Sequence, residues 1–135
     1  MFPAATKGGG QAVANPDVCK VPAPPGPPVP TPFPNLGDLT QAQMVSVRVK
    51  IAGAPAITTG SKLLRTMGDE AGVGGGMVSG MNMGPASFKE GVSTVEVEGN
   101  PIVALLNMTA HNGSNANAPA GMIVSPSQGK VFVKK

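Results

Sequence analysis

The stretch from Cys19 to Asn35 reads CKVPAPPGPPVPTPFPN, and eight of its seventeen residues are proline. Proline fixes its own φ, lacks a backbone N–H donor, and disfavours the α region for the residue before it. These properties exclude a helix or a central strand here and predict extended, polyproline-like backbone. At about 3.1 Å per residue, the stretch would extend roughly 50 Å. We therefore expect residues 19–35 to be either a belt on the surface of the domain or a linker that stays undocked.

The composition around this stretch is that of a folded, glycine-punctuated chain. The 135 residues predict a single domain over 1–135, with 19 Gly and 15 Pro. Hydrophobic residues make up 41% and charged residues only 13%, the reverse of a disordered chain. The formal net charge is +3 and the basic residues are scattered, while aromatic residues make up only 3%. Nucleic-acid binding is therefore not expected, because no stacking platform accompanies the charge.

The sequence also carries expectations about its cellular location. No apolar run approaches the roughly 20 residues that cross a membrane, so stable membrane insertion is not expected. A charged stretch followed by an apolar stretch, as in a secretory signal, is absent at the N-terminus. We therefore expect the chain to be made in the cytoplasm.

Three stretches alternate apolar and polar residues with a period of two, which is typical of half-buried strands. They span residues 44–52, 92–99 and 130–135. Residues 36–43 predict at most one helical turn, so we expect little or no helix. The side chains expected to face the core in the first two stretches are Val45, Val47, Val49, Val95 and Val97.

The first two strands belong to an internal repeat, with units near 45–59 and 93–105. Val49-x-Ile51-x-Gly53-x-Pro55-x-Ile57 matches Val95-x-Val97-x-Gly99-x-Pro101-x-Val103 position by position. Repeats of this period indicate stacked or symmetry-related units. We expect Gly53, Pro55, Gly99 and Pro101 to set the corners of the repeats. Residues 115–135 form a further C-terminal strand region.

The outward faces of the two repeats carry opposite charges, Arg48 and Lys50 in one and Glu96 and Glu98 in the other. If the strands pair, these charges face each other and contribute a few tenths of a kcal/mol each. Two separate solvated faces are the simpler expectation.

Few residues could carry chemistry. The run GVGGGM lacks the Lys-Ser/Thr of a phosphate loop. Cys19 and His111 are the only cysteine and histidine, so they are the only candidates for a nucleophile–base pair and the only sulfur and imidazole ligands for a metal. Structural zinc needs four ligands, so a complete site would require carboxylates such as Asp69 or Glu70, water, or a partner chain. The alternative is a buried free thiol and a surface histidine, and we do not expect an enzyme.

The proline stretch leaves one further function open. Overlapping P-x-x-P steps begin at Pro22, Pro24 and Pro27 and could bind an SH3-like groove. A proline-rich adaptor is therefore the alternative to the function described next.

Five blocks of the sequence resemble the PAAR-like domain family. They are FPAATKGGG at 2–10, NPDVCKVPAPPGPPVPTPFPN at 15–35, GDEAGVGGGMVSG at 68–80, VEVEG at 95–99 and HNGSN at 111–115. The resemblance covers about residues 1–114. It implies an all-β fold, namely a small cone of short strands with pseudo-threefold internal repeats.

The resemblance also implies a function, a partner and a cofactor. Such proteins are non-enzymatic tips of contractile injection machines, chiefly the type VI secretion system. They cap and sharpen a trimeric valine-glycine-repeat (VgrG-like) β-helical spike, dock effector or toxin cargo, and leave the bacterium on the spike without a signal peptide. Typical members hold zinc near the apex with three histidines and one cysteine. Cys19 and His111 are the only residues of this chain that match that set.

Overall fold

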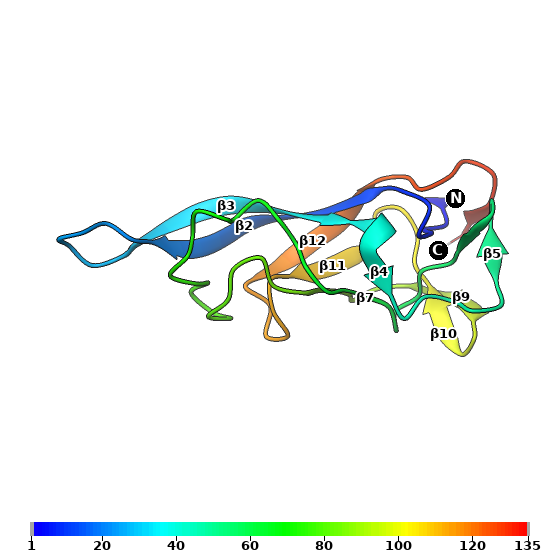
Figure 1. Cartoon of the computed structure of the whole chain (residues 1–135). Helices are drawn as coiled ribbons and strands as arrows, with labels where there is room; N and C mark the ends of the chain where they lie inside the picture. The colour runs from blue at the N-terminus through cyan, green and yellow to red at the C-terminus, as the bar shows by residue number, and fades with distance from the viewer. Residues whose placement is uncertain (1, 135) are drawn as a thin grey trace.

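The computed structural model describes residues 2–134, and the regular secondary structure in that range is almost entirely β-strand (Figure 1). The only helix in that range is one 3₁₀ turn, η1 (Leu39–Gln41), where Asp38 Oδ1 accepts from the Thr40 N–H over 3.0 Å. The all-β prediction and the single turn near 36–43 are confirmed. The single domain over 1–135 stays a prediction, and Met1 and Lys135 lie outside the described residues.

Within the described residues, the strands form one large sheet and three small ones, and all of these pairs are antiparallel. The seven-stranded sheet has the order β3-β2-β12-β11-β8-β7-β4. Its strands are β2 (Gln11–Val21), β3 (Val29–Asp38), β4 (Ala42–Gln43), β7 (Lys62–Leu63), β8 (Ala86–Phe88), β11 (Met108–His111) and β12 (Ala118–Ser125). The two-stranded sheets pair β1 (Phe2–Pro3) with β13 (Phe132–Val133), β5 (Lys50–Ile51) with β6 (Ala54–Pro55), and β9 (Val92–Val97) with β10 (Asn100–Ile102).

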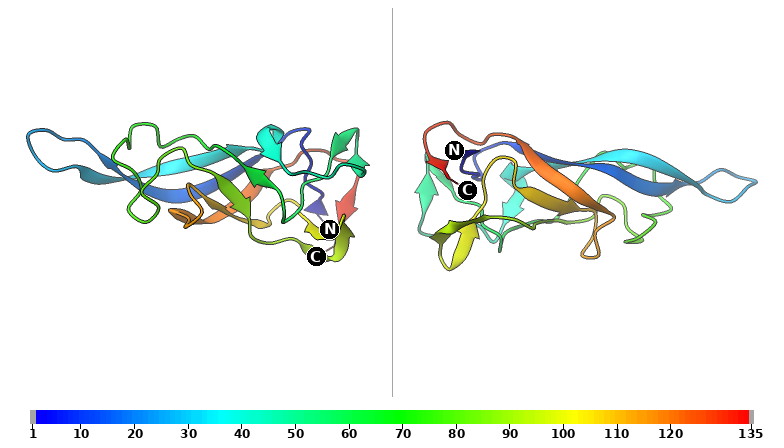
Figure 2. Two further views of the ribbon diagram at one scale, coloured as in Figure 1. Left: turned by 60° about the horizontal axis from the view of Figure 1, so that its bottom comes forward. Right: turned by 180° about the vertical axis from the view of Figure 1, so that it is seen from behind.

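The molecule is elongated and tapers from a broad end to a narrow end (Figures 1 and 2). The narrow end is the half of the molecule that tapers along β2 and β3 to the loop between them. The broad end holds the three two-stranded sheets and both chain termini. Within residues 2–134, no helix is long and apolar enough to cross a membrane.

The proline stretch is neither a belt nor an undocked linker, and that prediction is wrong. Its two halves form the arms of the β2–β3 hairpin, in which Pro30 pairs with Lys20 and Pro32 with Val18. The Lys20 N–H donates to Gly75 O over 2.9 Å, so it points away from β3. Positions opposite such residues direct their own N–H away from the hairpin partner as well. Prolines at alternate positions of this edge strand therefore cost no ladder bonds and block further strand pairing.

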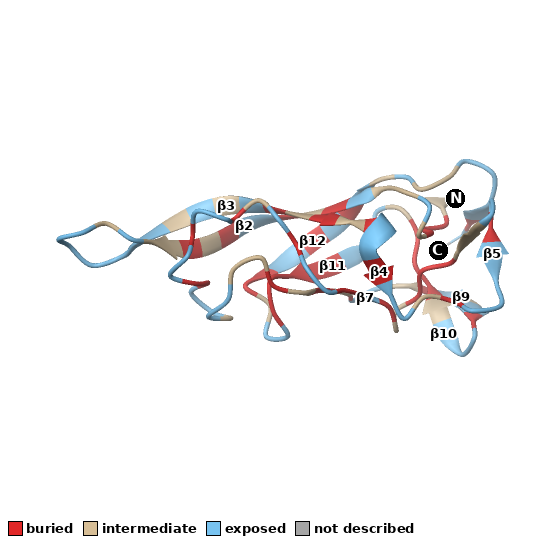
Figure 3. Cartoon of the chain, in the orientation of Figure 1, coloured by how far each residue is buried: buried red, intermediate tan, exposed pale blue. Residues whose placement is uncertain are grey.

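Among the described residues, two apolar clusters fill the broad part of the molecule, and Figure 3 shows that buried residues continue along β2 and β12 towards the narrow end. The first comprises Ala5, Ala12, Leu39, Ala42, Ile57, Leu63, Ala86, Phe88, Val103 and Ile123. The second comprises Ala4, Ile51, Ala56, Val92, Val97, Ile102, Ala104 and Val133. A third buried group is polar, and it includes Asp17, Asn35, Asp69, His111 and Asn112.

The strand predicted over 44–52 is mostly absent, because only Lys50–Ile51 is extended and paired. Val47 is 81% exposed, Val49 is 36% exposed, and Ser46 is buried instead. The Ser46 hydroxyl donates to the Val49 carbonyl and accepts from the Ala56 N–H over 2.8 Å, which folds this stretch into a turn. Tertiary hydrogen bonds therefore override the alternating pattern.

The other three valines behave differently. Val97 is buried in the second apolar cluster, and Val95 packs partly buried against it. Val45 packs partly buried against the first cluster. Val47 and Val49 are thus the two predicted core residues that the structure places outside the core.

Candidate functional site

The broad end is organised by a closed ring of backbone hydrogen bonds among three segments, 4–6, 56–58 and 102–104. The Ala5 N–H donates to Val103 O over 2.8 Å, the Val103 N–H to Ile57 O over 2.9 Å, and the Ile57 N–H to Ala5 O over 3.0 Å. Each segment donates to one neighbour and accepts from the other. The ring therefore has the connectivity of a threefold axis, although one chain makes it.

Two further sets of bonds repeat around this ring. Each of the three prolines that precede the segments accepts from the neighbouring segment: Leu105 N–H to Pro3 O over 2.9 Å, Lys7 N–H to Pro55 O over 2.9 Å, and Thr59 N–H to Pro101 O over 3.1 Å. Each segment also ends on a side-chain acceptor: Thr6 N–H to Ser127 Oγ, Thr58 N–H to Ser61 Oγ, and Ala104 N–H to Asn107 Oδ1. The pseudo-threefold arrangement thus extends beyond the ring itself.

Each segment begins at or directly after the last residue of a strand in a two-stranded sheet, namely β1, β6 or β10. In the sheet that contains β1, the second strand comes from the other end of the chain. Lys50 pairs with Pro55 in the first repeat and Glu96 with Pro101 in the second. Phe132 pairs with Pro3 in the same way, joining β13 to β1. The internal repeat predicted from two copies therefore has a third copy that is split between the termini.

Sequence reasoning missed this third copy, although a signal exists. Pro3-Ala-Ala-Thr-Lys-Gly8 and Pro55-Ala-Ile-Thr-Thr-Gly60 share proline, alanine, threonine and glycine at the same spacing. The threonines have the same role, because Thr6 Oγ1 accepts from the Gly8 N–H over 3.1 Å and Thr58 Oγ1 from the Gly60 N–H over 3.3 Å.

The glycines predicted as repeat corners lie in two-residue hairpin turns. Gly53 has φ of +83° after Ala52 at +52°, and Gly99 has φ of +88° after Glu98 at +53°. Positive φ at both central residues is the conformation of a type I′ turn, which matches the twist of the flanking strands. Pro55 and Pro101 lie on the returning strands just after these turns.

Towards the narrow end, the interior is a polar cluster centred on Asp17. Asn35 Nδ2 donates to Asp17 Oδ2 over 3.0 Å, Asn112 Nδ2 donates to Asp17 Oδ1 over 3.0 Å, and Asn117 Nδ2 donates to Asp17 Oδ1. Asp17 is 0% exposed. Burial raises the pKa of Asp17, but the hydrogen bonds from Asp69 and the three asparagines outweigh burial and lower it overall. Asp17 is therefore a buried carboxylate anion.

Asp69 and Cys19 lie beside this anion, and the pKa of each is raised above its ordinary value. Burial, together with the hydrogen bond to Asp17 and its charge, raises the pKa of Asp69 to about 7. Burial and the charges of both carboxyl groups raise the pKa of the Cys19 thiol to about 12. The thiol donates towards Asp17 Oδ1 over 3.5 Å and Asp69 Oδ2 over 3.7 Å.

His111 is fully buried, and both of its ring nitrogens are hydrogen-bonded. Because the Asn35 amide nitrogen donates to Asp17 and Thr66, the Asn35 oxygen accepts from His111 Nδ1–H over 2.7 Å. His111 Nε2 then accepts from the Thr109 hydroxyl over 2.8 Å. Burial lowers the pKa of His111 to about 4, so the ring is neutral.

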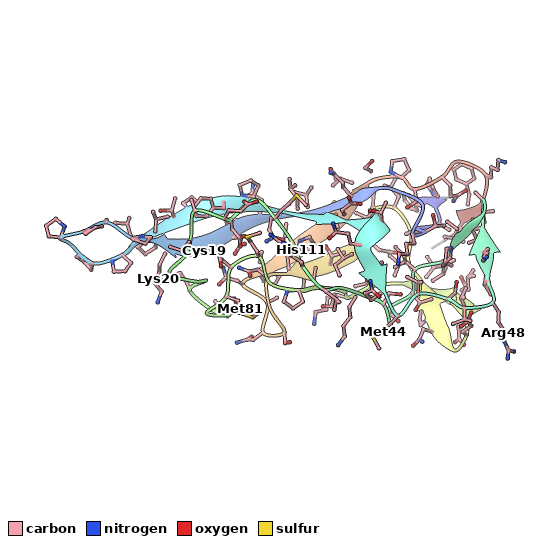
Figure 4. The ribbon with its side chains drawn as sticks, viewed as in Figure 1. Cys19, Lys20, Met44, Arg48, Met81 and His111 are labelled. Atoms are coloured by element: carbon pink, nitrogen blue, oxygen red, sulfur yellow. The ribbon has the colours of Figure 1, made fainter. Side chains whose placement is uncertain are left out.

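The structure groups Cys19 with carboxylates, and His111 is not in that group. Ligand atoms of Asp17, Cys19 and Asp69 lie within 4.8 Å of one another, which makes these three residues the candidate metal site of the described chain. Asp69 was among the carboxylates anticipated from the sequence, whereas Asp17 was not. In Figure 4, Cys19 and Met81 lie towards the narrow end, His111 lies nearer the middle, and Arg48 lies at the broad end.

Comparison with known proteins identifies the family. The model of the toxin PAAR-like domain matches residues 10–118. No curated protein and no solved structure matches the chain. Since the family match spans most of the 135 residues, the chain belongs to the family of toxin PAAR-like domains.

Proposed function

We propose that this chain is the non-enzymatic tip of a contractile injection apparatus of the type VI secretion kind. Its broad end caps a trimeric VgrG-like β-helix, with one tip on each trimer. The observation that carries the proposal is the ring in which Ala5, Val103 and Ile57 donate to one another in a cycle. Family membership supports the same function.

The ring matters because a trimer ends in three identical surfaces. A single chain can contact all three equally only if it presents the same backbone geometry three times. The hairpins β1–β13, β5–β6 and β9–β10 do this in matching registers. A β-structured spike would otherwise end in strands with unpaired backbone groups. The three hairpins cover these edges, in the same way as a peptide strand that adds to the edge of a sheet.

The tapering shape supports a mechanical role for the other end. The β2–β3 hairpin extends the molecule to a point (Figure 1), and Pro30, Pro32 and Pro34 leave that part of the β3 edge unable to pair with another strand. The tip is then assembled in the bacterial cytoplasm and leaves on the spike without a signal peptide, together with any effector that it docks.

The proline-rich adaptor receives no support from the structure of the hairpin. An SH3-like groove binds a polyproline helix, but the residues on both sides of the loop belong to β2 and β3. Within the loop, the Gly26 N–H donates to Ala23 O over 2.9 Å, which makes a tight turn. No extended polyproline ligand remains.

A cysteine–histidine enzyme is also unsupported. A catalytic cysteine needs a lowered pKa and a base aimed at its sulfur. The pKa of Cys19 is raised to about 12, and His111 bonds to Asn35 and Thr109 instead.

The test is native mass spectrometry of the chain mixed with a trimeric VgrG-like spike protein from the genome that encodes it. The expected complex contains one chain on three spike chains. As a control, a variant in which residues 23–27 are replaced by a two-residue turn alters only the narrow end and should bind equally. A wild-type chain that stays free beside an intact trimer would overturn the proposal.

A further inference from the structure

We propose that the narrow end of this chain is organised by a buried anion, the Asp17 carboxylate, in the place where the family resemblance implies a metal. The charge arrangement is thereby inverted. In a metal-held apex, acceptor ligands surround a cation, whereas here hydrogen-bond donors from Asn35, Asn112 and Asn117 surround a carboxylate.

Asp17 has no acceptor capacity left for a metal. A carboxylate offers about four lone-pair positions. Oδ1 accepts from Asn117, from Asn112 over 3.0 Å and from the Cys19 thiol over 3.5 Å, and Oδ2 accepts from Asn35 over 3.0 Å and shares the Asn112 amide over 3.2 Å. A metal bound to Asp17 would have to displace side-chain amides that are themselves held in place.

Amide donors face the space between Asp17, Cys19 and Asp69. Asn112 Nδ2 lies 3.6 Å and Asn117 Nδ2 lies 3.9 Å from Cys19 Sγ. These amide groups direct the positive ends of their dipoles at the space that a cation would share with the sulfur. Such an arrangement favours negative charge and disfavours a zinc ion.

Cys19 and His111, the two residues that match the family's ligand set, already have hydrogen-bond partners. The Cys19 sulfur donates its proton towards Asp17 and Asp69, whereas zinc binds the thiolate. Both nitrogens of His111 are bonded to Thr109 and Asn35. Among the described residues, no buried side-chain nitrogen or oxygen lacks a hydrogen-bond partner. The residues therefore do not fit zinc.

The Asp17 anion connects separate segments of the chain, as a bound metal ion would. It connects β2, which carries Asp17, to β3 through Asn35 and to the turn between β11 and β12 through Asn112 and Asn117. Asn112 and Asn117 extend the connection, because Asn112 Oδ1 accepts from the Gly84 N–H over 2.9 Å and Asn117 Oδ1 from the Val78 N–H over 2.7 Å. One carboxylate thus fixes four segments that have little apolar core between them.

Metal analysis of the wild-type chain tests the proposal without any substitution. The protein is incubated with excess zinc chloride, passed through a desalting column, and analysed by native mass spectrometry and elemental analysis. We expect well under one zinc per chain, about 0.1 or less, and a Tm that changes by less than about 2 °C when EDTA is added. One zinc retained per chain, with a Tm that falls on chelation, would overturn the proposal.

Asp17→Asn gives a second test, in which the two explanations predict opposite signs. In an empty metal site, removing one carboxylate relieves repulsion, so the Tm of EDTA-treated protein rises. Around an anion, the same change removes the charge and replaces one accepting oxygen by an NH2 donor that faces the asparagine amides, so the Tm falls by about 10 °C or more, or the variant does not fold. Glu70→Gln is the matched control, since Glu70 is an exposed acid next to Asp69 and should leave the Tm unchanged. A Tm for Asp17→Asn equal to or above that of wild type would refute the anion.

Discussion

The buried carboxyl groups of Asp17 and Asp69 hydrogen-bond to each other, although the two residues come from distant parts of the chain. Two ionised carboxylates in hydrogen-bonding contact would repel each other strongly, so one of the two carboxyl groups holds the shared proton. Asp17 has the additional donors and a lowered pKa, and the pKa of Asp69 rises to about 7. The protonation state of this pair makes the stability of the narrow end depend on pH.

Asp69→Asn is expected to stabilise the protein at pH 8. The pKa of Asp69 is raised from 3.8 to about 7 on folding, so its favourable contribution is complete below about pH 4 and is lost as the pH rises through about 7. Asparagine keeps a donor for Asp17 and an acceptor for the Met83 N–H at every pH. At about 1.4 kcal/mol per pKa unit, the gain in unfolding free energy is about 2 to 4 kcal/mol at pH 8 and close to zero at pH 4. Urea unfolding at both pH values measures it, and an equal effect at both would contradict the assignment of the proton.

His111 should not titrate over the range in which an ordinary histidine does. Its pKa is lowered to about 4 by burial, so it contributes stability above about pH 6.5 that is lost as the pH falls towards 4. Because the chain has a single histidine, its ring resonances in proton NMR are assigned without ambiguity. We expect no change in their chemical shift between pH 8 and pH 5.5. A midpoint near 6.5 would mean that the ring is exposed to water.

Two glycine substitutions separate backbone strain from close packing. A Cβ at Gly99 would contact nothing within 4 Å, so Gly99→Ala costs only the strain of φ at +88°, about 1 kcal/mol. A Cβ at Gly76 would lie 2.3 Å from the Asn117 side chain, so Gly76→Ala must displace a donor to Asp17. We expect it to cost about 3 kcal/mol or more. Equal losses in chemical denaturation would show that Asn117 can move freely.

Substitutions at Val97 and Val47 test whether an alternating apolar–polar pattern identifies buried residues. Both were predicted to face the core, but Val97 is 6% exposed and Val47 is 81% exposed. Val97→Asp buries an unpaired charge in the second apolar cluster and should unfold the domain. Val47→Asp should change the unfolding free energy by less than about 0.5 kcal/mol. A folded Val97→Asp variant with an unchanged melting curve would contradict the burial of β9.

The sequence predicted those parts of the fold that depend on local geometry. The repeats at Gly53 and Gly99 were visible because a two-residue hairpin needs particular residues at fixed spacing. The alternation around Val47 misled because Glu98, far along the chain, accepts from the Val47 and Arg48 N–H groups, with 2.9 Å to Arg48. Glu98 of the second repeat thus contacts the first repeat through backbone N–H groups. The hydrogen bonds from Arg48 and Val47 also lower the pKa of Glu98.

The centre of the polar cluster could not be predicted for a different reason. Asp17 binds side chains that are 18, 95 and 100 positions away in sequence. No local pattern connects them, and a search for metal ligands favours Cys19 and His111 over asparagine. The asparagine-rich stretch after His111 was the available signal, because asparagine side chains often satisfy buried polar groups.

The three equivalent positions at the broad end should make docking insensitive to charge. Lys50, Glu96 and Phe132 occupy the same place in the three repeats, opposite Pro55, Pro101 and Pro3 respectively. A homotrimer presents one chemistry to all three, and no single charge complements a cation, an anion and an aromatic ring together. Binding must then rest on the backbone geometry and apolar contacts that the three repeats share, which salt screens little. We expect Lys50→Glu and Glu96→Lys each to change the Kd for a trimeric VgrG-like spike by less than about threefold, and a rise from 50 to 500 mM NaCl to do the same. If the two variants instead shift the Kd in opposite directions by about tenfold, the spike carries a charged rim, and side chains rather than the repeated backbone select the partner.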